Sequence, residues 1–150
     1  MVGIGYDSHR FAEGRRLVLG GVEIEHERGL AGHSDADVLT HAVIDAVLGA
    51  AGGGDIGTMF PDDDERWRDA DSIDLLRTVV GTLSGPILNI DATVICEQPR
   101  LGPYKAEMER TLGEATSARI SVKATSNEGM GWIGRGEGIA CLAVAFIQSE

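Results

Sequence analysis

The amino-acid sequence predicts an α+β domain in which helices cover one face of a mixed four-stranded sheet, with a small β-hairpin beside it. Segments with alternating apolar residues, typical of strands, are interspersed with segments that repeat with the period of a helix. The chain has 150 residues, of which 43% are hydrophobic, and this is sufficient for one hydrophobic core. We therefore expect a single domain over residues 1–150.

The charge and the cysteines restrict the partners and the compartment. The formal net charge is −11, which argues against nucleic acid and anionic membranes as partners, because both require a basic face. Cys96 and Cys141 each lie in an apolar run, so we expect buried, reduced thiols in a cytoplasmic protein. No segment is apolar for long enough to span a bilayer, and the N-terminus lacks the layout of a signal peptide.

The first predicted strand, residues 2–7, leads into the first candidate metal ligands. In an extended strand Asp7 and His9 point to the same side, and together they form a pair that zinc accepts. A strand end with polar residues would explain the same pattern without a metal. The segment 17–24 then reads as two short strands joined at Gly20 and Gly21, which is typical of a hairpin.

A helix is predicted from about residue 35 to the glycine run at 52–54, with Ser34 or Asp35 capping its first turn. His41 lies one turn inside this helix and shares a face with Asp37, while His33 lies just outside its N-terminus. Free backbone N–H groups at such an end suit a phosphate or a carboxylate. The alternative is a capped helix with surface histidines and aspartates.

The following segment, 55–64, is rich in carboxylates and contains Phe60. It is either a mobile flap over a site or a solvated acidic loop, and its composition favours the loop. A second helix is expected to begin at Asp71 or Ser72 and to end at residues 84–86, where Gly85 precedes a proline.

The remaining third of the chain predicts strands separated by a helix and two loops. In the strand 87–96 every even position is apolar, which indicates a half-buried strand. A helix follows Pro103, and another strand precedes the glycine-rich stretch 126–138. The almost unbroken apolar run 139–147 predicts a strand covered on both sides. One of these sides is expected to be covered by another subunit, so we predict a homo-oligomer.

Asp7, His9 and His41 are the candidate ligands of a catalytic zinc site. Two imidazole nitrogens and one carboxylate would leave the fourth position of zinc open for water or substrate. Separation in the sequence does not by itself bring them together.

Several motifs, in the same order from end to end, resemble the 2-C-methyl-D-erythritol 2,4-cyclodiphosphate synthase family. They are GYDSHRF at 5–11, GHSDAD at 32–37, GDIG at 54–57, FPD at 60–62 and GRGEGIA at 134–140. The resemblance implies an enzyme of non-mevalonate isoprenoid biosynthesis, a phosphorus–oxygen lyase. Its substrate is 4-diphosphocytidyl-2-C-methyl-D-erythritol 2-phosphate, whose 2-phosphate attacks the β-phosphorus and expels CMP. It also implies a homotrimer, with sheets around a three-fold axis and active sites between subunits.

The resemblance also implies roles for individual residues. Asp7, His9 and His41 would hold Zn²⁺, and Glu128 would hold a second cation, Mg²⁺ or Mn²⁺. His33 and Ser126 would orient the phosphates, with Ser126 standing where threonine is usual. The other substrate positions fall into three groups. Those near the methylerythritol phosphate are Ser34, Asp55, Gly57, Phe60, Asp62 and Asp64; those on the cytidine side, from the neighbouring subunit, are Pro99, Arg100, Leu101, Gly102 and Thr125; those after Glu128 are Trp132 and Arg135. Arg135 alternatively serves an axial channel that holds an isoprenoid diphosphate.

Two other functions compete with this one. A zinc hydrolase of phosphate esters would place water at the open position of the metal, with His33 as the base. A trimer that binds isoprenoid or nucleotide ligands without turnover would need no metal chemistry. Product analysis distinguishes the first alternative, and replacement of His41 distinguishes the second.

Overall fold

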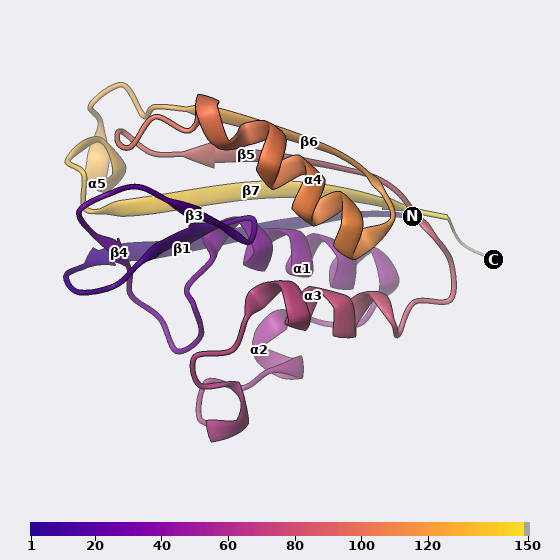
Figure 1. Cartoon of the computed structure of the whole chain (residues 1–150). Helices are drawn as coiled ribbons and strands as arrows, with labels where there is room; N and C mark the ends of the chain where they lie inside the picture. The colour runs from indigo at the N-terminus through magenta and orange to yellow at the C-terminus, as the bar shows by residue number, and fades with distance from the viewer. Residues whose placement is uncertain (149–150) are drawn as a thin grey trace.

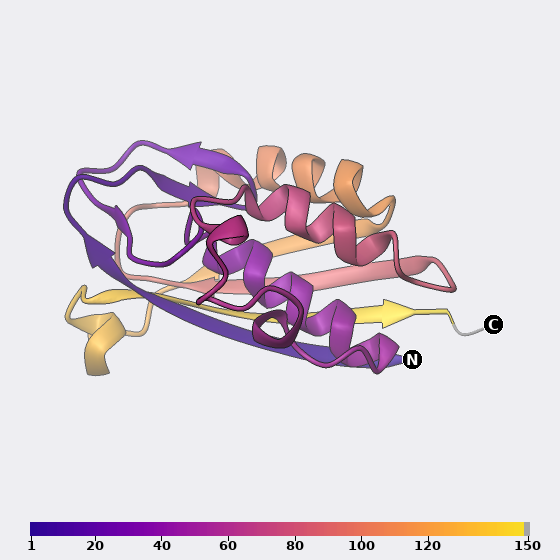
Figure 2. The same cartoon turned by 90° about the horizontal axis from the view of Figure 1, so that it is seen from below.

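A computed structural model describes residues 1–148 as a curved sheet with helices on one face (Figures 1 and 2). Within these residues the strands are β1 (Val2–Ala12), β2 (Leu17–Leu19), β3 (Val22–Ile24), β4 (Gly29–Leu30), β5 (Ile87–Ile95), β6 (Arg119–Thr125) and β7 (Gly138–Ile147). The helices are α1 (Val38–Ala51), α2 (Ile56–Met59), α3 (Ser72–Val80), α4 (Lys105–Thr116) and α5 (Gly131–Gly134), with single 3₁₀ turns at Glu65–Trp67 and Gly102–Tyr104.

The main sheet of the described chain has five strands in the order β4-β1-β7-β5-β6, and β2 pairs with β3 in the predicted hairpin. The predicted mixed sheet is confirmed, because β5 and β6 are parallel while the other neighbours are antiparallel. The predicted strand count of four was wrong. The additional strand, β4, has only two residues, which is too short to produce a periodic pattern in the sequence.

Strand β1 is longer than predicted, and its inward face is unusual. Pairing with β7 continues to Arg10, so Asp7 and His9 lie within the strand rather than at its end. Gly3 and Gly5 occupy the same face, directly against α1. A Cβ atom there would lie only 2.1 Å from the carbonyl oxygen of Ala46 or 2.0 Å from that of Ala42, respectively. These glycines therefore allow the strand and the helix to approach backbone to backbone.

Helix α1 begins later than predicted, and a different residue caps it. Asp37, not Ser34 or Asp35, accepts a hydrogen bond from Thr40 N at 2.9 Å. The same carboxylate accepts the backbone N–H groups of Gly20 and Gly21 in the hairpin turn, each at 2.8 Å. Asp37 is therefore fully buried rather than on a polar face, because it joins α1 to the hairpin.

Helix α3 starts as predicted, with Asp71 accepting a hydrogen bond from Ile73 N at 2.8 Å. It ends at Val80, before the predicted stop at 84–86. In β5 the even-position pattern fails at Leu88, which is exposed because the register shifts between Ile87 and Asn89. The stretch that follows β6 contains the short helix α5 rather than loop alone.

Helices α1, α3 and α4 lie on one face of the sheet, and within residues 1–148 no helix covers the opposite face at its centre (Figure 2). Strand β7 was expected to be covered on both sides, but in the single chain it is covered on one side. The large apolar side chains exposed on the open face are Val2, Ile4, Tyr6, Leu142, Val144 and Phe146. Among the described residues, no helix combines the length and hydropathy needed to cross a bilayer. Cys96 and Cys141 are buried free thiols, as predicted.

Candidate active site

The three predicted zinc ligands converge where β1 meets the first turn of α1. The Asp7 Oδ2 atom lies 2.8 Å from His9 Nε2 and 3.2 Å from His41 Nδ1. The two ring nitrogens are 3.3 Å apart. His41 reaches the strand because Gly3 and Gly5 allow α1 to lie directly on β1.

This cluster has the dimensions of a metal site. A tetrahedral ion with bonds of about 2.0–2.1 Å requires ligand atoms about 3.3 Å apart. The observed separations of 2.8, 3.2 and 3.3 Å are close to that value. One carboxylate and two imidazoles form a donor set suited to zinc. The three side chains are therefore a candidate metal centre of the described chain.

Each histidine is oriented by a hydrogen bond on the side of the ring away from the cluster. His9 Nδ1 lies 2.7 Å from the carbonyl oxygen of Ala31, and a carbonyl only accepts, so this nitrogen carries the proton. In the neutral ring the lone pair of His9 Nε2 is then free for a metal ion, and in the protonated ring Nε2 donates to Asp7 Oδ2, 2.8 Å away. On His41 the outward nitrogen is Nε2, which contacts the hydroxyls of Ser72 at 2.8 Å and Ser34 at 3.1 Å.

The charges of the cluster favour a bound cation. Burial raises the pKa of the Asp7 carboxyl, but hydrogen bonds from His41 and His9 outweigh this effect and lower the pKa to about 2. For His9, burial lowers the pKa, but the hydrogen bond and the charge of Asp7 prevail and raise the pKa above 6.5. An ionised carboxylate between two imidazoles therefore attracts positive charge, which either a proton or a metal ion supplies.

A hollow of about 200 Å³ opens beside the cluster and contains much of the predicted phosphate-binding side. It is lined by Asp7, His9, Gly32, His33, Ser34, His41, Ile56, Gly57, Phe60, Asp62, Trp67 and Leu75. His33 is held by its Nε2 atom, which lies 3.3 Å from the carbonyl oxygen of Asp64. Arg15 supports the same loop by donating to the carbonyl groups of Gly32 at 2.8 Å and Ser34 at 2.7 Å.

Some residues expected near this hollow have other partners. Asp55 is exposed and caps α2 through Thr58 N at 2.7 Å, and the Asp64 carboxylate pairs with Arg66 at 2.6 Å. Phe60 was expected in a flexible or solvated segment, but it is buried. Its ring packs edge-on against Trp67, with the ring centres 4.9 Å apart. The acidic segment 55–64 is therefore anchored at Phe60.

The predicted cytidine-side residues form a second hollow, of about 520 Å³, at the end of β6. Its lining includes Pro99, Arg100, Leu101, Gly102, Thr125 and Ser126. Strands β7 and β5 lie between β6 and β1, so Ser126 is not grouped with Asp7, His9 and His41 in one chain. Glu128 is exposed on the next turn, with φ of 53°, and this turn is held by Glu97, which accepts from Asn127 N at 2.7 Å.

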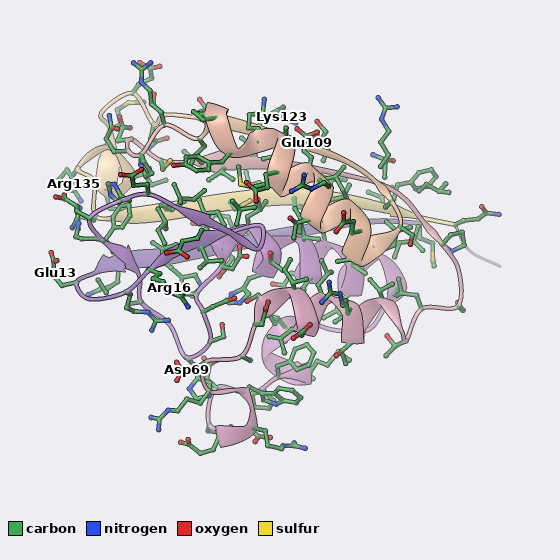
Figure 3. All side chains as sticks on the ribbon, in the orientation of Figure 1. Glu13, Arg16, Asp69, Glu109, Lys123 and Arg135 are labelled. Carbon is green, nitrogen blue, oxygen red and sulfur yellow. The ribbon has the colours of Figure 1, made fainter. Side chains whose placement is uncertain are left out.

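Trp132 and Arg135 line a third hollow, of about 730 Å³, together with Arg10, Arg28 and neighbouring residues. Figure 3 shows Arg135 at the periphery beside α5. Most of the predicted site residues therefore line three hollows of the described chain, of which the first and the third share His9.

The sequence over residues 1–148 matches the model of the YgbB family. The chain belongs to the YgbB family. A relative from Symbiobacterium thermophilum, named 2-C-methyl-D-erythritol 2,4-cyclodiphosphate synthase, is 55% identical, with 98% of each chain covered. The resemblance inferred from the motifs is thereby confirmed.

Solved structures of YgbB-like chains share the fold. A 2C-methyl-D-erythritol-2,4-cyclodiphosphate synthase in a form bound to CDP aligns with a TM-score of 0.89 and 34% identity, covering 99% of this chain and 100% of that one. The bifunctional IspDF from Campylobacter jejuni aligns with a TM-score of 0.92 and 42% identity, covering 96% of this chain. The chain spans 41% of the length of that bifunctional protein.

Three supporting residues of this YgbB-family site were missed from the sequence. Ser72 contacts His41, Asp35 contacts Ser72, and Arg15 holds the His33 loop. For Ser72 and Asp35 the only available signal was that both stood at helix starts, which is also typical of simple caps. For Arg15 no local pattern distinguishes a loop-binding arginine from a solvated one.

Proposed function

We propose that this chain is a 2-C-methyl-D-erythritol 2,4-cyclodiphosphate synthase of non-mevalonate isoprenoid precursor biosynthesis. It converts 4-diphosphocytidyl-2-C-methyl-D-erythritol 2-phosphate to 2-C-methyl-D-erythritol 2,4-cyclodiphosphate and CMP. The observation that carries the proposal is the convergence of Asp7, His9 and His41 within 3.3 Å of one another beside a hollow lined by His33 and Ser34. The 55% identical relative bears the same name.

The reaction joins two anionic phosphates of the same substrate. The attacking oxygen is already negatively charged, so the protein must bring like charges together rather than supply a strong base. Zinc held by Asp7, His9 and His41 supplies positive charge to offset that of the phosphate oxygens. His33 and the Ser126 hydroxyl orient the phosphates through hydrogen bonds, and Ser34, Gly57 and their neighbours bind the methylerythritol phosphate.

We assign the second cation, Mg²⁺ or Mn²⁺, to Glu128 and the cytidine to the hollow lined by Pro99, Arg100, Leu101, Gly102 and Thr125. In one chain these groups lie apart from Asp7, His9 and His41, so a complete site requires a second chain. We infer a homotrimer that packs the open apolar faces of its sheets around a three-fold axis. Trp132 faces the substrate, and Arg135 faces either the substrate or an isoprenoid diphosphate in the axial channel. We place the enzyme, a phosphorus–oxygen lyase, in the cytoplasm.

Product analysis tests this function directly. The purified protein, supplied with zinc, Mg²⁺ and the cytidine diphosphate substrate, should release CMP and the cyclic diphosphate, which phosphorus NMR identifies. A linear product would indicate a phosphate-ester hydrolase instead, and binding without turnover would indicate a ligand-binding protein.

Replacing the proposed ligand should abolish both metal binding and turnover. His41→Ala is expected to lose stoichiometric zinc and nearly all activity, because two ligands hold the ion too weakly. His26→Ala is the matched control, since His26 packs against Phe11 with ring centres 5.5 Å apart and lies outside the three hollows. Retention of one zinc per chain by His41→Ala would count against the ligand assignment.

A further inference from the structure

We propose that Ser72 and Asp35 form a relay that positions His41 for metal binding. The relay runs from the Asp35 carboxylate through the Ser72 hydroxyl to the Nε2 atom of His41, and it joins the loop before α1 to the helices α3 and α1. It rests on the proposed metal site at Asp7, His9 and His41. Ser72 and Asp35 are positioning residues, because they act through His41 and not on the substrate.

The first half of the relay is fixed by the start of α3. Ser72 is the first residue of that helix and is fully buried. Its backbone N–H donates to Asp35 Oδ2 at 2.9 Å, and its hydroxyl donates to Asp35 Oδ1. Asp35 Oδ1 also accepts from the backbone N–H of Asp37 at 3.1 Å. The carboxylate is therefore held on both oxygens and cannot turn away from Ser72.

The loop backbone directs the two neighbouring carboxylates in opposite directions. Ala36, which lies between Asp35 and Asp37, adopts φ of 57° and is fully buried. This left-handed conformation is costly for alanine, so the surrounding contacts must hold it. As a result Asp37 caps α1 and binds the hairpin turn, while Asp35 reaches α3.

The direction of each hydrogen bond follows from the chemistry of the groups. A carboxylate only accepts, so the Ser72 hydroxyl gives its proton to Asp35. The oxygen of that hydroxyl is then an acceptor for His41 Nε2 at 2.8 Å, which places the ring proton on Nε2. The remaining nitrogen, Nδ1, lies 3.2 Å from Asp7 Oδ2, and in this tautomer its lone pair is free to bind a metal ion held together with that carboxylate. The relay thus selects the tautomer of His41 that a metal ion requires.

Ser34 is the alternative partner of His41 Nε2, at 3.1 Å. The Nε2 atom has only one proton to give, and Ser72 is closer and has its orientation fixed by Asp35. The Ser34 hydroxyl therefore keeps its own proton available for an anion in the hollow that it lines. Ser72 accordingly serves two purposes: it fixes His41 and leaves Ser34 available to the substrate.

The test compares Ser72→Ala with a matched loss of a buried hydroxyl elsewhere. Thr116→Val is the control, because the Thr116 hydroxyl is also buried and donates at 2.7 Å to the carbonyl oxygen of Leu112 on α4. Zinc affinity is measured on metal-free protein against a competing chelator at fixed pH. We expect Ser72→Ala to bind zinc about 10- to 100-fold more weakly than the wild type, and Thr116→Val to bind it with unchanged affinity.

A spectroscopic measurement separates positioning from a general effect on folding. Nitrogen NMR of the histidine rings should show the Nε2–H tautomer of His41 in the wild type and in Thr116→Val, and a mixture of tautomers in metal-free Ser72→Ala. The visible absorption of the Co²⁺-loaded protein should change in the same variant only. Thermal unfolding of both variants checks that each is folded.

The outcomes also separate the relay from the proposed function. If the wild type binds zinc, and Ser72→Ala binds it with the same affinity and the same tautomer, the relay is wrong and the metal site stands. If the wild type binds no zinc, the proposed metal site and the relay are both refuted. Equal losses in Ser72→Ala and Thr116→Val would also overturn the relay, because the effect would then be one of stability alone.

Discussion

At the scale of single residues, each proposed metal ligand is fixed by a partner from a different part of the chain. Asp7 is held between the two imidazoles, His9 by the carbonyl group of Ala31, and His41 by Ser72. The ionised carboxylate and the raised pKa of His9 make the site attractive to either a proton or a metal ion. If zinc binds as proposed, protons and zinc compete for the same nitrogen atoms.

This competition predicts opposite pH dependences for stability and for metal affinity. The folded-state pKa of His9 is raised above 6.5, so the His9–Asp7 pair stabilises the metal-free protein below pH 6.5. That contribution is lost as the pH rises through the raised pKa of His9. Zinc affinity should increase over the same interval, because the metal requires the unprotonated ring. The contribution of the ionised Asp7 carboxylate to stability is lost only as the pH falls from 3.8 toward about 2.

Denaturant unfolding of the metal-free protein at about pH 6 and about pH 8 measures the stability, and chelator competition measures zinc affinity at the same pH values. His9→Ala is the control and should reduce both dependences. A zinc affinity that does not change between the two pH values would contradict this account of the site.

At the scale of elements, the site depends on how closely α1 lies against β1. Gly3 and Gly5 leave no side chain between the strand and the helix, so His41 at the helix start reaches Asp7 within the strand. Asp37 then ties the start of α1 to the hairpin turn through Gly20 and Gly21. The geometry of the ligands is thus a property of the β1–α1 pair.

Gly5→Ala should displace the helix and loosen the metal site. A Cβ at this position would lie 2.0 Å from the Ala42 carbonyl oxygen, so one of the two backbones has to move. We expect a loss of about 1–3 kcal/mol in the free energy of unfolding and a clear loss of zinc affinity. Denaturant unfolding and chelator competition measure the two effects.

Gly49→Ala is the matched control within α1. Its Cβ would meet no atom closer than 3.8 Å, and alanine is the better helix former. This variant should be as stable as the wild type or more stable by about 0.5–1 kcal/mol, with unchanged zinc affinity. If both variants behave alike, the close approach at Gly5 does not set the site geometry.

These contacts explain how far the sequence could predict the site. The two-residue period of a strand is sufficient to place Asp7 and His9 on the same face of β1. The family was identified from the longer sequence motifs. The capping residue of α1 was mistaken because Asp35 and Asp37 are both suitable caps, and only the distant partners Ser72 and Gly20 separate their roles. The exposure of Leu88 follows from a register shift with β7, which no local pattern encodes.

At the scale of the whole molecule, α1, α3 and α4 and the cluster of Asp7, His9 and His41 lie on one side of the sheet, and the centre of the other side is apolar and open. Ile4 is 70% exposed there and Phe146 is 42% exposed, which is unusual for large apolar side chains. The two hollows assigned to phosphates and cytidine lie at opposite edges of the sheet. Assembly through the open face would bury the apolar residues and allow one chain to complete the site of another.

Mixed assemblies test this arrangement. His41→Ala and Ser126→Ala each damage a different half of the site, so each variant alone should have little activity. When both are co-expressed in equal amounts, sites that combine an intact triad from one chain with an intact Ser126 from its neighbour should restore about a quarter of wild-type activity. Steady-state CMP release measures the recovery.

The baseline for this experiment is the sum of the activities of the two variants measured separately. Activity at that baseline in a mixture that has been shown to contain both chains in one assembly would mean that each site is built from a single chain. If the wild-type protein in solution has the molecular mass of a single chain, the proposed trimer is also refuted.

The glycine pair in β1 has a consequence for how the interior of this protein tolerates change. Where backbone rests on backbone, the gap between two elements does not depend on the rotamers or volumes of neighbouring side chains. Substitutions deeper in the core, at Leu112 for example, can then alter packing without shifting the ligand atoms. Natural drift and laboratory redesign of that interior should therefore be tolerated independently of catalysis.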